Sequence, residues 1–177
     1  MTFNDYKQKD ESGYGSHIPA LSFIFEHVEI KTAVEYGMGL FSTSFLLDKV
    51  KDKVLSIEMQ SQDWYETVTN RYQSEKWKHR FTDKVWKFMD YPDCDLILVD
   101  GSSITRAIGV VYAMERGIEN IVLHDTESSW YGYNMIAEYV EKFGYFEQEF
   151  TEQAPYTKVF TKNKKLIDAI KLQYHNN

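Results

Sequence analysis

Short apolar runs alternate with amphipathic segments along most of the chain. Four such runs, at residues 33–36, 53–58, 95–100 and 120–125, have the length and composition of β-strands. The last two are continuous enough to be strands that are buried on both faces of a sheet. Between the runs, apolar residues recur three and four positions apart, which indicates helices.

The pattern predicts a regular order of elements. The expected helices are residues 19–28, 41–47, 62–77, 104–116, 130–143 and 166–174. The expected strands are residues 33–36, 53–58, 83–88, 95–100, 120–125, 145–150 and 158–161. Alternating strands and helices form a mostly parallel sheet that is covered on both faces, and two consecutive final strands fit an antiparallel edge. The length suits a single domain, residues 1–177. Residues 1–18 are expected to be a flexible N-terminal segment or a lid, with 14–17 closing over the site.

A glycine turn follows the first strand. Gly37 and Gly39 let a ligand approach the backbone, and the helix that comes next offers free N–H groups. Glu58 ends the second strand about twenty residues later, which is the pattern that holds ribose hydroxyls in dinucleotide folds. The third glycine of the pyrophosphate motif is replaced by Ser42. Glu35 before the turn would also repel a pyrophosphate, so NAD is disfavoured as the ligand.

Residues 35–39 read E-Y-G-M-G. This run resembles the first motif, E/D-x-G-x-G, of the class I S-adenosylmethionine-dependent methyltransferases, and the resemblance extends over most of the chain. It implies an α/β fold with a Rossmann-like seven-stranded sheet in the order 3-2-1-4-5-7-6.

The resemblance also implies S-adenosylmethionine as cofactor. Glu58 would bind both ribose hydroxyls, and Gly37 and Gly39 would lie against the methionine part. Glu35 would face the cofactor's amino group, and Asp90, after the third predicted strand, would bind the adenine amino group.

Three polar residues end the fourth and fifth predicted strands: Asp100, His124 and Asp125. Parallel neighbours end at the same edge of a sheet, so we expect one cluster there. Close carboxylates raise one another's pKa unless a cation or proton is shared. Two interpretations stay open: Asp100 and Asp125 hold Mg²⁺ or Mn²⁺, or His124 is a general base with an orienting carboxylate.

His124-Asp125, together with residues 99–101 and Arg106, resembles the sugar and polysaccharide O-methyltransferases. That looser resemblance implies methyl transfer to a hydroxyl of a carbohydrate or other small acceptor. Trp130 and Tyr131 could stack on such an acceptor. The alternative function is a methyltransferase-like protein that binds the cofactor or a nucleoside without transferring methyl.

The formal charge of −7 disfavours a nucleic-acid partner, which normally meets a basic surface. A motif N/D-P-P-Y/F for base amino groups is also missing. The sequence has no apolar run of the ~20 residues that span a membrane and no signal-peptide core, so a cytoplasmic protein is expected. The single cysteine, Cys94, excludes an intrachain disulfide. None of these features determines the oligomeric state, for which a homodimer is one expectation.

Overall fold

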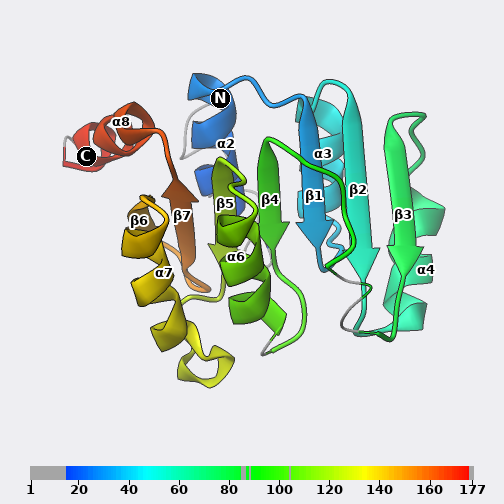
Figure 1. Cartoon of the computed structure of the whole chain (residues 1–177). Coiled ribbons are helices and arrows are strands. Elements are labelled where there is room, and N and C mark those ends of the chain that lie inside the picture. Colours follow the sequence, from blue (N-terminus) through cyan, green and yellow to red (C-terminus); the bar gives the residue numbers. More distant parts are fainter. Residues whose placement is uncertain (1–14, 85–86, 88, 104, 176–177) are drawn as a thin grey trace.

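The strands form one seven-stranded sheet in the order β3-β2-β1-β4-β5-β7-β6 (Figure 1). This architecture comes from a computed structural model that describes residues 15–84, 87, 89–103 and 105–175. The pairs β3-β2, β2-β1, β1-β4 and β4-β5 are parallel, whereas β7 runs antiparallel to both β5 and β6. The predicted fold class and strand order are confirmed.

The strands are β1 Thr32–Tyr36, β2 Lys53–Glu58, β3 Trp77–Phe81, β4 Leu96–Val99, β5 Asn120–His124, β6 Phe146–Phe150 and β7 Thr157–Thr161. The helices are α2 Ile18–His27, α3 Ser42–Lys49, α4 Gln62–Arg71, α6 Thr105–Glu115, α7 Ile136–Lys142 and α8 Lys164–His175, with short 3-10 helices at Ser129–Tyr131 and Tyr133–Met135. Among these described helices, not one combines the length and the apolar character that crossing a bilayer requires.

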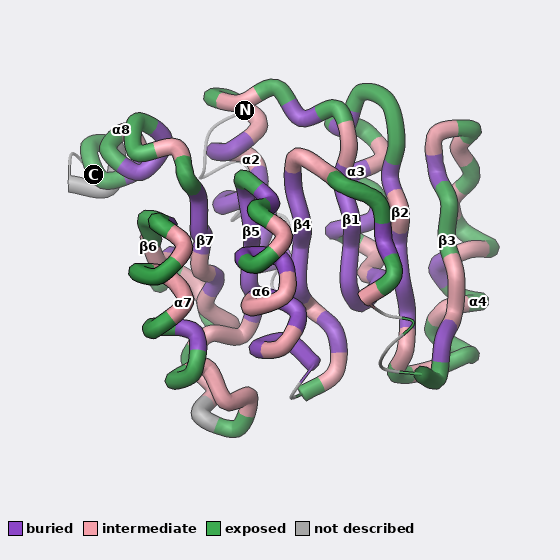
Figure 2. Tube along the Cα trace, viewed as in Figure 1, coloured by how far each residue is buried: buried purple, intermediate pink, exposed green. Residues whose placement is uncertain are grey.

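Side chains of the central strands alternate between two cores. Leu96 and Leu98 of β4 face a core that includes α2, α3 and α8, whereas Ile97 and Val99 face one formed with α6 and α7. Figure 1 shows α6 and α7 in front of the sheet and α3 behind it. Figure 2 shows the same central strands as continuously buried. Burial on both faces explains why these strands are apolar runs rather than alternating patterns.

The third strand was predicted wrongly. The sequence pattern put a helix over 62–77 and a strand over 83–88, but α4 ends at Arg71 and β3 starts at Trp77. Asp83 and Lys84 lie in a bend, and Val85, Trp86 and Phe88 fall outside the described residues. An edge strand needs little apolar surface, and only Trp77 of β3 is fully buried. Its signal was therefore too weak to separate it from the preceding helix.

The predicted helix over 130–143 is also shorter than expected, because α7 begins at Ile136. Gly132 lies between the two 3-10 turns with a φ of +71°. That left-handed conformation interrupts a right-handed helix and is readily adopted by glycine.

The N-terminal segment is described from Gly15 onward. Residues 1–14 of the expected lid fall outside the described residues. Ser16 and His17 are buried in a turn that leads into α2. This part of the segment is packed against the body of the protein.

Candidate functional site

A cavity of about 770 Å³ opens at the carboxyl ends of β1, β2, β4 and β5. In parallel α/β sheets, ligands bind at this edge, where the strand order reverses. Six of the eight residues predicted for the site line the cavity: Gly37, Gly39, Glu58, Asp100, His124 and Asp125. The other lining residues are His17, Met38, Leu40, Phe41, Ser42, Gln60, Trp64, Arg106 and Pro155.

Gly37 is required by the packing of the protein's own backbone. Its φ is +80°, and a Cβ added there would lie 2.2 Å from the carbonyl oxygen of Asp100. The turn after β1 therefore packs directly against the end of β4. At Gly39 an added Cβ would meet only the Ser42 hydroxyl, at 2.6 Å. The two glycines thus have different roles, although the sequence motif treats them alike.

The carboxylate of Glu58 is fixed in the cavity wall. The residue is 2% exposed. Its Oε2 accepts a hydrogen bond from the Met38 N–H at 2.9 Å, and its Oε1 accepts from the N–H groups of Met59 and Gln60 at 2.9 and 2.7 Å. A carboxylate has about four acceptor positions, and three are occupied here, so Glu58 has about one position left for a ligand hydroxyl.

Glu35 lies beneath the glycine turn and is not among the lining residues. It is fully buried and accepts hydrogen bonds from Thr43 Oγ1, at 2.9 and 3.0 Å, and from Ser56 Oγ at 2.5 Å. Thr43 Oγ1 in turn accepts from the N–H of Gly39 at 3.3 Å. Burial raises the pKa of Glu35 to about 7, against the opposing effect of the hydroxyl donors. Glu35 thus supports the shape of the turn.

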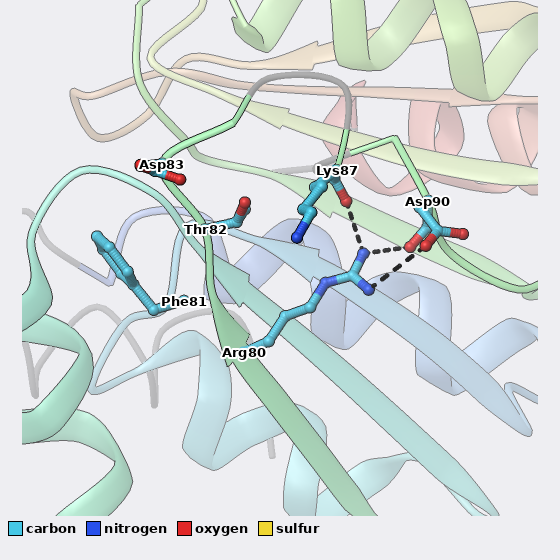
Figure 3. Close-up of a pocket in the computed structure, with 6 residues that line it drawn as sticks. All are labelled: Arg80, Phe81, Thr82, Asp83, Lys87 and Asp90. Carbon is cyan, nitrogen blue, oxygen red and sulfur yellow. Dashed lines mark hydrogen bonds and ion pairs between the residues drawn. The ribbon is translucent and has the colours of Figure 1, made fainter.

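Asp90 lies in a separate pocket of about 500 Å³, beside Arg80 and Lys87 (Figure 3). Its side chain is 86% exposed and approaches Nη1 of Arg80 at 3.9 Å. Thr82 and Asp83 hold the position directly after β3. The misplaced third strand is the reason that the sequence pointed to Asp90.

The predicted acceptor-side cluster is assembled, and Arg106 lies between its two carboxylates. Arg106 Nη2 is 3.0 Å from Asp100 Oδ1, and Nη1 pairs with Asp125. Nη1 also donates to the His124 carbonyl at 3.0 Å, and Nε donates to the Gly101 carbonyl at 2.6 Å. A guanidinium therefore supplies the shared cation that the sequence argument required between Asp100 and Asp125.

The backbone at Asp125 and the charges around Asp100 complete this arrangement. Asp125 has a φ of +59°, an uncommon conformation that aspartate tolerates better than most residues. Burial disfavours ionisation of Asp100. The contact with His124 and the charge of Arg106 outweigh burial and hold the pKa of Asp100 below its ordinary value.

His124 is 5% exposed, and both of its ring nitrogens have polar neighbours. Nε2 lies 2.7 Å from Ser16 Oγ, and Nδ1 lies 3.1 Å from Asp100 Oδ1 and 3.5 Å from Asp125 Oδ1. Burial lowers the pKa of His124, but the neighbouring carboxylates outweigh it and raise that pKa above its ordinary value.

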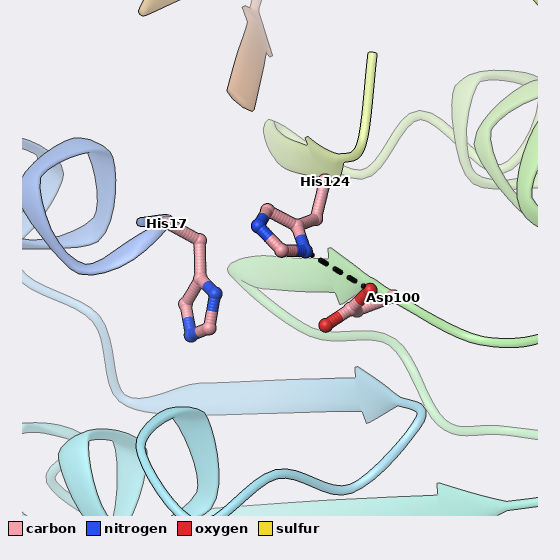
Figure 4. A group of neighbouring side chains, drawn as sticks. All are labelled: His17, Asp100 and His124. Carbon is pink, nitrogen blue, oxygen red and sulfur yellow. Dashed lines mark ion pairs between the residues drawn. The ribbon is translucent and has the colours of Figure 1, made fainter. Parts of the chain in front are cut away.

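His17 completes the group from the N-terminal side (Figure 4). Its ring meets that of His124 edge to face, with centroids 4.9 Å apart. The sequence placed residues 14–17 over the site but gave neither Ser16 nor His17 a role. Their neighbours come from the ends of β4 and β5, far away in the chain, so no local pattern marks them.

No family model and no curated protein sequence matches the chain. Solved structures do match. The methyltransferase domain of bacterial CtHen1-C aligns with 85% of this chain and 98% of its own, with a TM-score of 0.60 and 13% identity. The chain has a methyltransferase fold.

Two further structures support this statement. The O-methyltransferase TomG from Streptomyces achromogenes, in complex with S-adenosylmethionine, aligns over 85% of this chain and 79% of its own (TM-score 0.61, 12% identity). Precorrin-6y C5,15-methyltransferase from Geobacter metallireducens aligns over 92% and 97% (TM-score 0.62, 11% identity). At such identities the likeness shows the fold and leaves the chemistry to the residues of the site.

Proposed function

We propose that the protein is an S-adenosylmethionine-dependent methyltransferase that methylates a hydroxyl group of a sugar or another small acceptor. The observation that carries the proposal is the cavity itself. It places the glycine turn and the fixed carboxylate of Glu58 on one side and the cluster of Asp100, His124 and Asp125 on the other. One cavity thus offers a cofactor wall and an acceptor wall.

The cofactor wall suits the two ends of S-adenosylmethionine. Glu58 would accept a hydrogen bond from a ribose hydroxyl at its remaining acceptor position, because backbone N–H groups hold both its oxygens in the cavity wall. The turn at Gly37 and Gly39 would receive the methionine part. Glu35 would act from behind by holding Thr43, whose hydroxyl meets the N–H of Gly39.

Two carboxylates are candidates for binding the adenine amino group, Asp90 and Asp83. Asp83 follows β3 directly, whereas Asp90 is exposed beside Arg80. We favour Asp83 on this ground. Asp83→Ala should weaken cofactor binding more than Asp90→Ala does. The reverse order would show that Asp90 is the residue that binds adenine.

The acceptor wall provides a base. Asp100 and Asp125 are both paired with Arg106, so His124 is the group best able to take a proton. The acceptor oxygen would attack the methyl carbon in line with the C–S bond, which breaks and leaves a neutral thioether. The hydroxyl proton would pass to His124, whose proton affinity is raised by the carboxylates beside it.

A small or carbohydrate acceptor fits the surroundings of this wall. Trp130, in the 3-10 helix that follows β5, is 89% exposed and is available to stack on a sugar ring. Tyr131 instead covers the Arg106 guanidinium, at 4.6 Å from its ring centroid. The net charge of −7 disfavours a polyanionic acceptor.

Incubation with S-adenosylmethionine and a panel of sugars, catechols and other hydroxyl compounds tests the proposal. Formation of S-adenosylhomocysteine that depends on one acceptor class, and its loss in His124→Ala, is the expected result. Cofactor binding without any turnover over a broad panel would favour the alternative, a cofactor-binding protein that transfers no methyl group.

A further inference from the structure

Three side chains beside the cavity offer a ligand set that the sequence did not suggest: His17, Asp100 and His124. They come from the turn before α2, from the end of β4 and from the end of β5 (Figure 4). One ligand atom from each lies within 4.8 Å of the others. His17 and His124 are 2% and 5% exposed, so both imidazoles are held in place by packing.

The hydrogen bonds of Ser16 assign the tautomer of His124. Ser16 Oγ has one proton, and that proton goes to the Pro155 carbonyl at 2.7 Å, since a carbonyl can only accept. Ser16 Oγ must therefore accept from His124 Nε2–H, 2.7 Å away. In the neutral ring, the lone pair of His124 is then on Nδ1, and Nδ1 faces Asp100.

This lone pair meets another acceptor. Nδ1 lies 3.1 Å from Asp100 Oδ1, yet it makes no well-aligned hydrogen bond among the described residues. A neutral ring nitrogen and a carboxylate oxygen repel each other at this distance unless a proton or a metal cation is shared between them, and the lone pair on Nδ1 can bind either one. Two ligands about 2.1 Å from one cation are about 3.0–3.4 Å apart at octahedral or tetrahedral angles, and the observed separation falls in that range.

The local charge also favours a dication. Asp100 and Asp125 contribute two negative charges and Arg106 one positive charge, which leaves an excess of one carboxylate. Two imidazoles with one carboxylate suit Zn²⁺, Fe²⁺ or Co²⁺ better than Mg²⁺, which prefers oxygen ligands.

We propose that His17, Asp100 and His124 Nδ1 bind one divalent transition-metal ion at the wall of the cavity. Ser16 orients His124 for this purpose through Nε2 and is a positioning residue. The site differs from the pair Asp100 and Asp125, because two imidazoles take the place of the Asp125 carboxylate as ligands. Only three protein ligands are supplied, so a further coordination position would face the cavity.

The consequence for catalysis rests on the proposed function, whereas metal binding does not. An acceptor hydroxyl bound at the open position would have a lowered pKa. Its proton would then leave to water in the open cavity, because Nδ1 as a metal ligand could not accept it. His124 would thus be the base only in the metal-free protein, and with an ion bound the acceptor hydroxyl would be activated by the ion instead.

Calorimetric titration of the metal-free protein with Zn²⁺, without any cofactor, tests the site. The expected result is one ion per chain, with affinity lowered at least about tenfold in His17→Gln and in Asp100→Asn. Ser16→Ala should lower it by roughly tenfold as well, since the second ring nitrogen loses its partner. His27→Gln, on the exposed side of α2, is the matched control and should bind as the wild type does.

Visible absorption of Co²⁺ gives a second readout. Bands that appear on Co²⁺ addition and are lost or shifted in His17→Gln support the site, with circular dichroism showing that the variant is folded. Zn²⁺ binding that is unchanged in folded His17→Gln, or lost equally in His27→Gln, would overturn the proposal. Zn²⁺ binding without S-adenosylhomocysteine binding would count against the proposed function alone, and the opposite pattern against the metal site alone.

Discussion

Gly37 is a residue that cannot be replaced in this structure without strain. Gly37→Ala should lower the free energy of unfolding by more than the roughly 1–2 kcal/mol that a left-handed conformation costs a non-glycine residue. The excess arises because the new Cβ would meet the Asp100 carbonyl at 2.2 Å. Urea unfolding followed by circular dichroism measures the difference.

Gly144 provides the control for this effect. Its φ is +71°, but no atom lies within 4 Å of an added Cβ. Gly144→Ala should therefore cost only the conformational strain. Equal losses in the two variants would show that the contact between the turn and β4 is not what requires Gly37.

Glu35 makes stability depend on pH. Its folded-state pKa of about 7 lies above the ordinary value of 4.5. The stability it contributes is therefore complete below pH 4.5 and is lost as pH rises toward 7. Between pH 5 and pH 7.5 the wild type should lose roughly 2–3 kcal/mol of unfolding free energy through this group, and Glu35→Gln should remove that loss.

Urea unfolding at both pH values checks the prediction. Glu66→Gln is the control for removing a carboxylate, since Glu66 is exposed on α4, and it should retain the wild-type pH dependence. A Glu35→Gln variant with the same pH dependence as the wild type would mean that Glu35 does not carry this proton in the folded state.

At the scale of elements, Arg106 connects α6 to the loops after β4 and β5. Its guanidinium donates to the carbonyls of Gly101 and His124 and pairs with both nearby carboxylates. Lysine keeps the charge but lacks the planar fork. Arg106→Lys should therefore lower the unfolding free energy by about 1–3 kcal/mol, the cost of buried groups left without partners.

Arg71→Lys is the matched control. Arg71 ends α4, is exposed, and has its guanidinium 5.8 Å from the ring centroid of Tyr72. An exposed contact of this kind contributes about 0.5–1 kcal/mol and lysine keeps the charge, so this variant should be close to the wild type in urea unfolding. Equal losses of unfolding free energy in the two variants would show that Arg106 does not join the two loops.

The elements differ in how far the sequence predicts them. β4 and β5 are buried on both faces, so their apolar runs were found without difficulty. β3 is an edge strand with one buried residue, and its pattern merged with the preceding helix. Because the third strand was predicted over 83–88, the acid predicted to follow it was Asp90, whereas Asp83 is the acid next after β3.

Site residues follow the same physical rule. Glu58, Asp100 and His124 directly end apolar strands, so their position at the sheet edge could be inferred from the chain alone. The depth of Glu35 beneath the turn could not be inferred, since it depends on Thr43 and Ser56 from other elements. Ser16 and His17 join the site only through tertiary contacts, which cannot be predicted from the local sequence pattern.

At the scale of the whole molecule, the sheet brings the ends of four strands together around one cavity. The strand order places β1 between β2 and β4. Glu58, the glycine turn and the Asp100 cluster are thereby arranged in sequence along the sheet edge. This arrangement is the basis for our proposal that the cavity binds S-adenosylmethionine, with Glu58 at the ribose.

Titration calorimetry with S-adenosylhomocysteine tests that claim most directly. The wild type should bind one molecule per chain, and Glu58→Ala should weaken binding by roughly 1–3 kcal/mol, the scale of charge-assisted hydrogen bonds. Glu66→Ala, which removes an exposed carboxylate from α4, should bind as the wild type does. Tight binding of NAD with no response to S-adenosylmethionine or S-adenosylhomocysteine would contradict the account.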